Sequence, residues 1–537
     1  MKKSFVIFLG AFFVSMAAMA DWSAPVQVSV DPVTQGFVRQ LDVDGSGNAL
    51  LVWTEGMKEI VGSEFDGQDW SEPQTLFVDE DDILKVSIAK SLINDRAVLS
   101  YLTAERGISN VKASIFDGTS WSAIERLIEN NAVPVNIGLD MNVKGDALDI
   151  GVKRRWPDIN TVDVQSFFAQ ESSFVGPIGA DTFTDDAIPP YPYLSDYSVS
   201  TGDYPLREKK TYAVWFNNDL VILKSFDEAT KTWSFVRQWD PTDTETFAYV
   251  AANGLGQIFV AWLDSSQEKI FGDYFDGTVW DGAAELAYPN EDIEDVTVGI
   301  DENGVPHFVL STEYDDSTGS VVAGFRNPAT SSWVITTLDQ ASSTRRLGGS
   351  TLAVHADGAA LAVWAVKPSS STEDYQLVYK RYLPGFGWSS WIQELVDLDE
   401  SIFDVNAPRA AISRDGTAIV AWHDLVEEGK KQVFSLSDPM FTNPAVPVPP
   451  QNLIGCKKKN SFLTEAEYFN VLSWDETCDP VVVSYRLYRN GEKIADIPLS
   501  GKPCFVDHNR CKKGEDLYEL TAVNELGEES EPVSISL

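Results

Sequence analysis

The part of the chain before Cys456 contains no cysteine, and the whole sequence contains only four histidines. Without cysteine, this part has neither disulfides nor thiolate metal sites. The histidines stand in no HExxH, GxSxG or Cys–His pattern, and no Gly-rich phosphate loop follows a strand. The sequence therefore predicts no catalytic residue. The histidines are His307, His355, His423 and His508.

Positive charge is also scarce. The chain has 41 Lys and Arg against 81 Asp and Glu, which gives a formal net charge of −40 at pH 7 and a pI of 4.3. Such a surface repels nucleic acid and anionic membranes, which excludes both as partners, and it favours cations or basic partners. A plainer interpretation is that the acidity keeps an exported protein soluble.

Long apolar runs are absent after the N-terminus, which predicts no membrane-spanning helix. At the N-terminus, Lys2 and Lys3 precede an apolar run over residues 5–16, and Ala18-Met19-Ala20 is a small-x-small cleavage pattern. Residues 1–20 are therefore predicted to be a signal peptide, and the mature chain to begin at Asp21. We expect an exported protein, located in the periplasm or outside the cell.

Helical periodicity is nearly absent, whereas short strand patterns recur. The segment LDVDGSGNALLVW (41–53) recurs in similar form at 250–262, 352–364 and 410–422. The segment FDGQDW (65–70) recurs as FDGTSW (116–121) and FDGTVW (275–280). With weaker versions there are about eight copies, which is typical of a repeat architecture. Each copy predicts four strands, in which Asp-Gly or Asn-Gly turns form hairpins and an apolar run forms the buried second strand.

Four-stranded units repeated in this way predict an all-β propeller over residues 21–438, with eight blades or, as the alternative, seven. The N-terminal WSAPVQVSV matches a fourth strand, so it is expected to complete the last blade. In this interpretation the tryptophan of FDGxxW packs between blades. The alternative is that it stacks on a ligand.

The FDGxxW turn resembles that of the sialidase-like, BNR/Asp-box propellers, which place an Asp-containing turn ending in Trp between the third and fourth strands. Here Asp and Gly are adjacent, and the family's preceding Ser and its RIP-type arginine signature are absent. The resemblance covers the propeller topology and this turn. This resemblance would imply that the protein is a glycan-active hydrolase.

After a Pro-rich linker at 439–452, residues 453–537 resemble a fibronectin type III domain. Trp474 matches that family's core tryptophan, YRLYRNGEKI (485–494) its central hairpin, and Tyr518 its late-strand tyrosine. All four cysteines, Cys456, Cys478, Cys504 and Cys511, lie here. In an exported chain they predict up to two disulfides with three possible pairings, and a zinc site is the alternative.

Three arginines precede predicted inner strands and are candidate ligand-binding residues: Arg39, Arg346 and Arg409. The planar guanidinium suits carboxylate recognition, although pairing with nearby acids such as Asp404 is the simpler and favoured explanation. The same rim carries acidic connections at 79–82, 291–295 and 397–404. They predict solvated loops or, alternatively, a calcium site, and no other cofactor is expected.

We therefore expect an exported binding protein whose propeller face recognises a protein or a carbohydrate. The alternatives are a sialidase-like or other glycan-active hydrolase and a structural component of the cell envelope. The sequence leaves the oligomeric state open.

Overall fold

The computed structural model describes most of the chain from Trp22 to Leu537, and that part contains no helix that is long and apolar enough to cross a membrane. The predicted signal peptide and Cys478 lie outside the described residues. The segments left out after Trp22 are 31–32, 35–36, 106–107, 131–136, 142–144, 155–160, 171, 185–197, 202–209, 218–219, 242–245, 265–268, 288–292, 313–317, 369–374, 399–407, 428–429, 440, 444–445, 462–465, 476, 478, 480, 500, 513 and 525.

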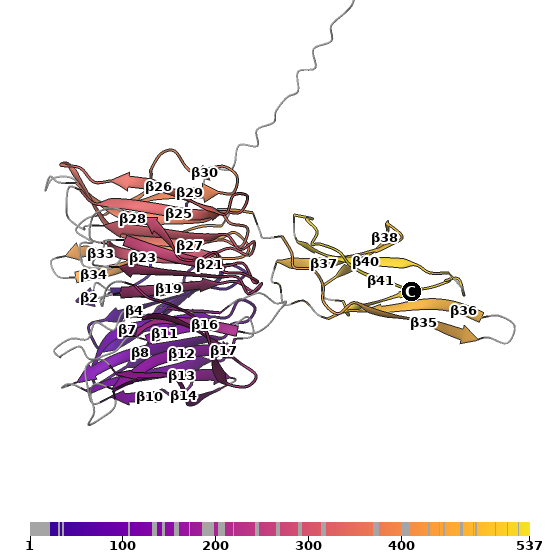
Figure 1. Cartoon of the computed structure of the whole chain (residues 1–537), viewed down its shortest axis with the longest axis horizontal. Helices are drawn as coiled ribbons and strands as arrows, with labels where there is room; N and C mark the ends of the chain where they lie inside the picture. The colour runs from indigo at the N-terminus through magenta and orange to yellow at the C-terminus, as the bar shows by residue number, and fades with distance from the viewer. Residues whose placement is uncertain are drawn as a thin grey trace, which may run out of the picture.

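Eight antiparallel sheets follow one another along the first part of the described chain (Figure 1). They are blade 1 (β3 Phe37–Val43, β4 Ala49–Glu55, β5 Glu59–Phe65, β6 Gln74–Val78), blade 2 (β7 Asp82–Lys90, β8 Ala97–Glu105, β9 Ile108–Phe116, β10 Glu125–Asn130), blade 3 (β11 Ile137–Met141, β12 Ala147–Arg154, β13 Thr161–Gln170, β14 Ser173–Thr184), blade 4 (β15 Ser198–Thr201, β16 Lys210–Asn217, β17 Leu220–Asp227, β18 Thr232–Trp239), blade 5 (β19 Thr246–Ala252, β20 Ile258–Asp264, β21 Lys269–Phe275, β22 Ala284–Ala287), blade 6 (β23 Ile293–Ile300, β24 Pro306–Thr312, β25 Ser320–Asn327, β26 Ser332–Gln340), blade 7 (β27 Arg345–Val354, β28 Ala360–Pro368, β29 Tyr375–Leu383, β30 Gly387–Trp388, β31 Gln393–Leu398) and blade 8 (β32 Arg409–Ile412, β33 Ala418–Glu427, β34 Lys430–Asp438).

The first strands of the blades form a closed ring. Each contacts the first strand of the next blade, from β3 through β7, β11, β15, β19, β23 and β27 to β32, and β32 contacts β3. Blade 8 is completed by the N-terminal strands β1 (Val26–Gln27) and β2 (Val33–Thr34), both paired with β34. The predicted propeller and its closure by the N-terminal strand are confirmed, and the sheets are consistent with eight blades rather than seven.

The second strands form the core, because each is covered on both faces by neighbouring blades. Every residue of β20 and of β24 is buried, and Trp53, Trp215 and Trp364 on second strands are fully buried. Continuous apolar runs such as IFVAW are therefore what the propeller requires at this position.

The FDGxxW motif is a hairpin that also joins blades. In blade 2 the Asp117 carboxylate accepts hydrogen bonds from the amides of Thr119 and Ser120, and Gly118 has φ of +96°, which favours glycine. Trp121 pairs with Phe116 across the turn at a ring distance of 5.3 Å and reaches Phe77 of blade 1 at 5.6 Å. These contacts support the interpretation of the motif as a structural device.

The C-terminal part is a sandwich of two antiparallel sheets. One contains β35 (Ile454–Ser461), β36 (Ala466–Ser473) and β39 (Cys504–Asp507), and the other contains β38 (Glu492–Pro498), β37 (Val482–Arg489), β40 (Leu517–Asn524) and β41 (Val533–Ser536), in that spatial order. Its core holds the rings of Trp474 and Tyr485, 5.5 Å apart, together with Leu487 and Leu520.

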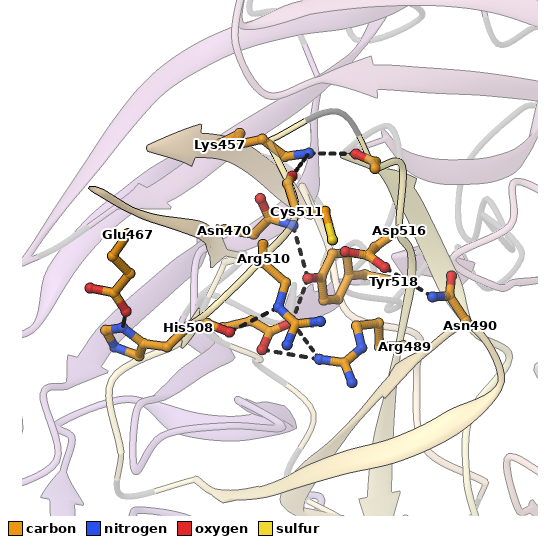
Figure 2. A network of polar contacts seen from close by, with 12 residues as sticks. Lys457, Glu467, Asn470, Arg489, Asn490, His508, Arg510, Cys511, Asp516 and Tyr518 are labelled. Atoms are coloured by element: carbon orange, nitrogen blue, oxygen red, sulfur yellow. Dashed lines mark hydrogen bonds and ion pairs between the residues drawn. The ribbon is translucent and has the colours of Figure 1, made fainter. Parts of the chain in front are cut away.

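A polar network fixes one end of this sandwich (Figure 2). The buried Tyr518 hydroxyl donates to Asp507 at 2.6 Å and accepts from the Asn470 amide at 2.9 Å, and Arg489 also binds Asp507 at 2.9 Å. The network ties β36, β37, β39 and β40 together. Burial and the neighbouring Asp507 raise the pKa of Tyr518.

The predicted disulfides are not present among the described residues. Cys456, Cys504 and Cys511 are exposed free thiols. Cys456 stands opposite Val471 and Cys504 opposite Ser473, on the two sides of β36. Two strand spacings place their Cα atoms roughly 10 Å apart, beyond the limit of about 7 Å for a disulfide. A bond between these two cysteines is therefore excluded, and the pairings that involve Cys478 stay a prediction.

A buried ion-pair cluster attaches the sandwich to the propeller. Arg414, in the β32–β33 turn, donates from Nε and Nη2 to the Asp479 carboxylate at 3.2 and 3.3 Å, and it also pairs with Glu302 in the β23–β24 turn. Asp479 accepts a further hydrogen bond from the Val448 amide at 2.8 Å. Removing one partner of this buried cluster would leave the other charge buried and unpaired, so these residues form a polar contact between the two domains.

Candidate functional site

The three predicted arginines lie at the beginnings of inner strands, but the structure joins only two of them directly. Arg409 donates from Nε to the backbone oxygen of Arg39 at 3.1 Å, and Arg39 donates from Nε to Thr54 at 3.2 Å. Burial lowers the pKa of both guanidinium groups, and Asp295 opposes this effect at Arg409. Arg346 is half-buried on β27, opposite Lys367 in register. Arg39 and Arg409 are thus in contact with one another, and ligand binding by the three arginines stays a prediction.

The acidic connection at 79–82 serves the fold. Asp79 accepts hydrogen bonds from Lys112 at 2.7 Å and from Tyr101 at 3.0 Å, and Asp81 lies 3.5 Å from Lys112. Residues 291–292 of the second connection and 399–404 of the third lie outside the described residues. Among the residues described, no group of three His, Cys, Asp or Glu side chains is arranged to hold a metal ion. Calcium binding stays a prediction, and a melting shift at millimolar calcium would test it.

The candidate site is a cavity between blades 6 and 7. It has a volume of 510 Å³, within the range of about 300–1,000 Å³ usual for ligand pockets. Aromatic side chains form part of its wall, beside apolar, glycine and polar residues. The lining residues are Asp301, Val305, His307, Phe325, Asn327, Pro328, Val334, Thr336, Gly358, Tyr382, Pro384, Gly385, Phe386, Gly387 and Trp388.

His307 is a buried polar residue of the cavity lining, between two aromatic rings. Its ring is 1% exposed, lies 5.9 Å from the Phe325 ring in a stacked arrangement and 5.1 Å from the Tyr382 ring edge-on. Neither ring nitrogen has a hydrogen-bond partner among the described residues. Burial lowers the pKa of His307 to about 3, so the imidazole is neutral at physiological pH.

The internal repeat shows that His307 is unusual. It is the second residue of its strand after the first hairpin, opposite Gly299. The register places an apolar residue at this position in the six other blades whose first hairpin is described, namely Leu50, Val98, Leu148, Phe259, Leu361 and Ile419. An imidazole with unpaired nitrogens therefore replaces an ordinary core side chain at one blade junction.

Blade 7 supplies the opposite wall through an altered turn. YLPGFGW takes the place of FDGxxW, and Tyr382 and Trp388 form its aromatic pair at 5.5 Å. The indole Nε1 of Trp388 is buried without a partner among the described residues. Phe386, at the tip of the turn, is 90% exposed at the rim. This turn therefore places an indole donor and aromatic rings beside the cavity.

One carboxyl group borders the cavity. Asp301 is buried in the β23–β24 turn, where it accepts the Val305 amide at 2.7 Å. Burial, assisted by the charge of Asp357, raises the pKa of Asp301 to about 7. Gly358 of the next blade is required here, because a Cβ atom would lie 2.5 Å from Asp301 Oδ2. The described lining contains no Lys or Arg.

The sequence held a signal for this site that motif searching misses. His307 belongs to no catalytic motif, yet aligning VGIDENGVPHFVLS with the other repeats places a histidine where they have an apolar residue. The degenerate YLPGFGW turn marks the other wall. Only the ring of blades shows that His307 and the turn that begins at Tyr382, which are far apart in the sequence, face one another.

No family model matches the chain, and no curated protein matches it. Solved structures similar to it include the Dos1 propeller (10% identity, 76% of this chain and 95% of that chain, TM-score 0.43). Another is the Aleuria aurantia lectin in complex with α-methyl-L-fucoside (8% identity, 59% of this chain and 97% of that chain, TM-score 0.33). A third is the β-propeller domain of the trilobed protease from Pyrococcus furiosus (10% identity, 68% of this chain and 99% of that chain, TM-score 0.37). The propeller fold is shown by the closed ring of contacts between the first strands of the blades.

Proposed function

We propose that the protein is an exported binding protein that recognises a glycan, or a glycan-bearing partner, in the cavity between blades 6 and 7. The observation that carries this proposal is the buried, neutral His307 with two unpaired ring nitrogens in an aromatic-walled cavity. A buried polar group without a partner costs about 1–3 kcal/mol, so a ligand that pairs it recovers this cost.

Binding explains this cavity better than hydrolysis does. A glycosidase of the usual kind places two carboxyl groups around the scissile bond, and a sialidase needs a cluster of arginines. The described lining offers one carboxyl group, Asp301, and no arginine. A sialidase-like reaction therefore has no support at this site.

The C-terminal sandwich is proposed to be a fibronectin type III module. The division into three and four strands, the buried Trp474 against Tyr485 and the hydrogen-bonded Tyr518 support this assignment. Glu302, which pairs with Arg414, directly follows Asp301 of the cavity wall, so the module is held beside the binding face.

A comparison of wild type with His307→Leu tests the proposal. Leucine stands at this position in three other blades, so the variant is expected to fold. Both forms of the mature chain would be applied to a glycan array and to envelope extracts. Retention of a glycan or glycoprotein by wild type and its loss in the variant are expected. The proposal would be refuted if the wild type retained no glycan or glycoprotein from the array and the extracts. It would also be refuted if both forms retained the same ligand equally.

A further inference from the structure

We infer that the cavity between blades 6 and 7 selects an uncharged, hydroxyl-bearing sugar unit and rejects acidic sugars and quaternary ammonium groups. This inference rests on the proposed function and specifies the class of ligand. Three properties of the lining lead to it: its hydrogen-bonding groups, its rings and its charge.

The unpaired groups require a ligand that both donates and accepts. A neutral imidazole has one N–H donor and one acceptor nitrogen, and the Trp388 indole adds one donor. A hydroxyl group can donate to one His307 nitrogen or accept from the other. A quaternary ammonium group has no hydrogen to donate and no lone pair, so it would leave all three atoms unpaired.

The rings provide apolar faces for the rest of the ligand. Phe325, Tyr382 and Trp388 pack in sequence at ring distances of 4.9 and 5.5 Å, and all three line the cavity. The C–H face of a pyranose ring has the apolar surface that such a wall buries favourably. Phe386 extends the aromatic surface to the rim of the cavity, where it meets solvent.

The charge of the lining excludes an anion. Asp301 repels a carboxylate whenever it is ionised, and no Lys or Arg of the described lining offsets it. Desolvating an acidic sugar here would therefore leave its charge unpaired, which is strongly unfavourable. Sialic and uronic acids are consequently expected to bind poorly.

Calorimetry on the mature full chain tests this inference with defined probes. The neutral probes are methyl glycosides of hexoses, deoxyhexoses and N-acetylhexosamines, the acidic probes are N-acetylneuraminic and glucuronic acids, and the cationic probe is tetramethylammonium. Binding of at least one neutral glycoside is expected, at least tenfold tighter than either acid or the cation. His307→Leu should weaken it tenfold or more, and Trp388→Phe, which removes the indole N–H and keeps an aromatic ring, about fivefold.

Trp391→Ala is the matched control, because Trp391 is a 70% exposed tryptophan of blade 7 outside the cavity lining. It should bind as wild type does. Preference for an acid or for tetramethylammonium, binding of no neutral glycoside, or a neutral glycoside bound equally by the His307 variant would overturn the inference. If the glycan array still shows capture that depends on His307, the proposed function survives that outcome. An empty array refutes both.

Discussion

The junction between blades 5 and 6 and the junction between blades 6 and 7 have the same backbone plan and different contents. In the first, Phe259 stands at the repeat position of His307, and its ring packs on Trp333 of the next blade at 5.1 Å. In the second, His307 faces a 510 Å³ cavity bordered by Trp388. We call the first junction closed, after its packed rings, and the second open, after its cavity; a phenylalanine-to-histidine difference and one altered turn accompany the cavity.

The comparison teaches that a propeller can build a pocket without changing its strand framework. Six junction positions stay apolar, so the ring keeps its packing energy. The seventh position carries His307, a buried polar group that destabilises the fold and lines the cavity. At His307, stability and binding should therefore respond in opposite directions to substitution.

The largest expected effect is at the closed junction. Trp333→Ala should destabilise the propeller by about 3 kcal/mol, because it removes a ring that packs against Phe259 and Phe308. Trp388→Ala should cost about half as much, since one side of that ring already faces the cavity. Urea unfolding of both variants measures the difference, and equal losses would contradict the distinction between the junctions.

A second effect concerns the pH dependence of stability at Asp149, a buried carboxyl group of which one oxygen accepts a hydrogen bond and the other has no partner among the described residues. Asp149 of blade 3 is buried and accepts the Ser100 hydroxyl of blade 2 at 2.7 Å, and burial raises the pKa of Asp149 to about 7. Between the unfolded pKa near 3.8 and this value, the native state holds more protons. Its stability therefore falls by about 1.4 kcal/mol per pH unit as the pH rises from 4 to 7.

Asp149→Asn removes this titration. The variant should be more stable than wild type by about 2 kcal/mol at pH 8, and the difference should shrink or reverse at pH 4. Denaturant titrations at pH 4, 6 and 8 would measure it. A constant difference over this range would show that the carboxyl group does not titrate as the geometry indicates. Ser100→Ala, which removes the hydrogen-bond donor, is the matched control for lost packing.

At the open junction, His307→Leu should stabilise the protein by about 1 kcal/mol at pH 8, because it removes a buried polar group without a partner. The pKa of His307 is about 3 in the native state against 6.5 when unfolded, so stability is lost as pH falls from 6.5 to 3. At pH 5 the gain should therefore rise by about 2 kcal/mol. Thermal melting at both pH values tests this. A destabilised variant would indicate that His307 serves packing instead.

The smallest expected effect on stability is at the rim. Phe386→Ala should leave the unfolding free energy within about 0.5 kcal/mol of wild type, because the ring is exposed, yet it should weaken binding of a neutral glycoside about threefold. Glycoside titration and melting of the same sample separate the two effects. Unchanged affinity would restrict the site to the inner wall formed by Phe325, Tyr382 and Trp388.

The sequence by itself determined the architecture. Its period of turns and apolar runs predicts four-stranded units, and the spare strand WSAPVQVSV predicts ring closure, because both depend on local patterns and on the burial of second strands. The structure confirms them. The Trp of FDGxxW could likewise be placed between blades, since a large ring beside a tight turn has nowhere else to be buried.

Only the tertiary structure decided where a site could form. It showed that Arg39 and Arg409 contact one another and that Cys456 and Cys504 stand too far apart to bond. It also showed that His307 meets Tyr382 of the next blade, in a cavity that Trp388 borders. The physical reason is that a cavity is a property of two surfaces brought together. Each blade's sequence specifies one of those surfaces, and the closure of the ring specifies which two meet.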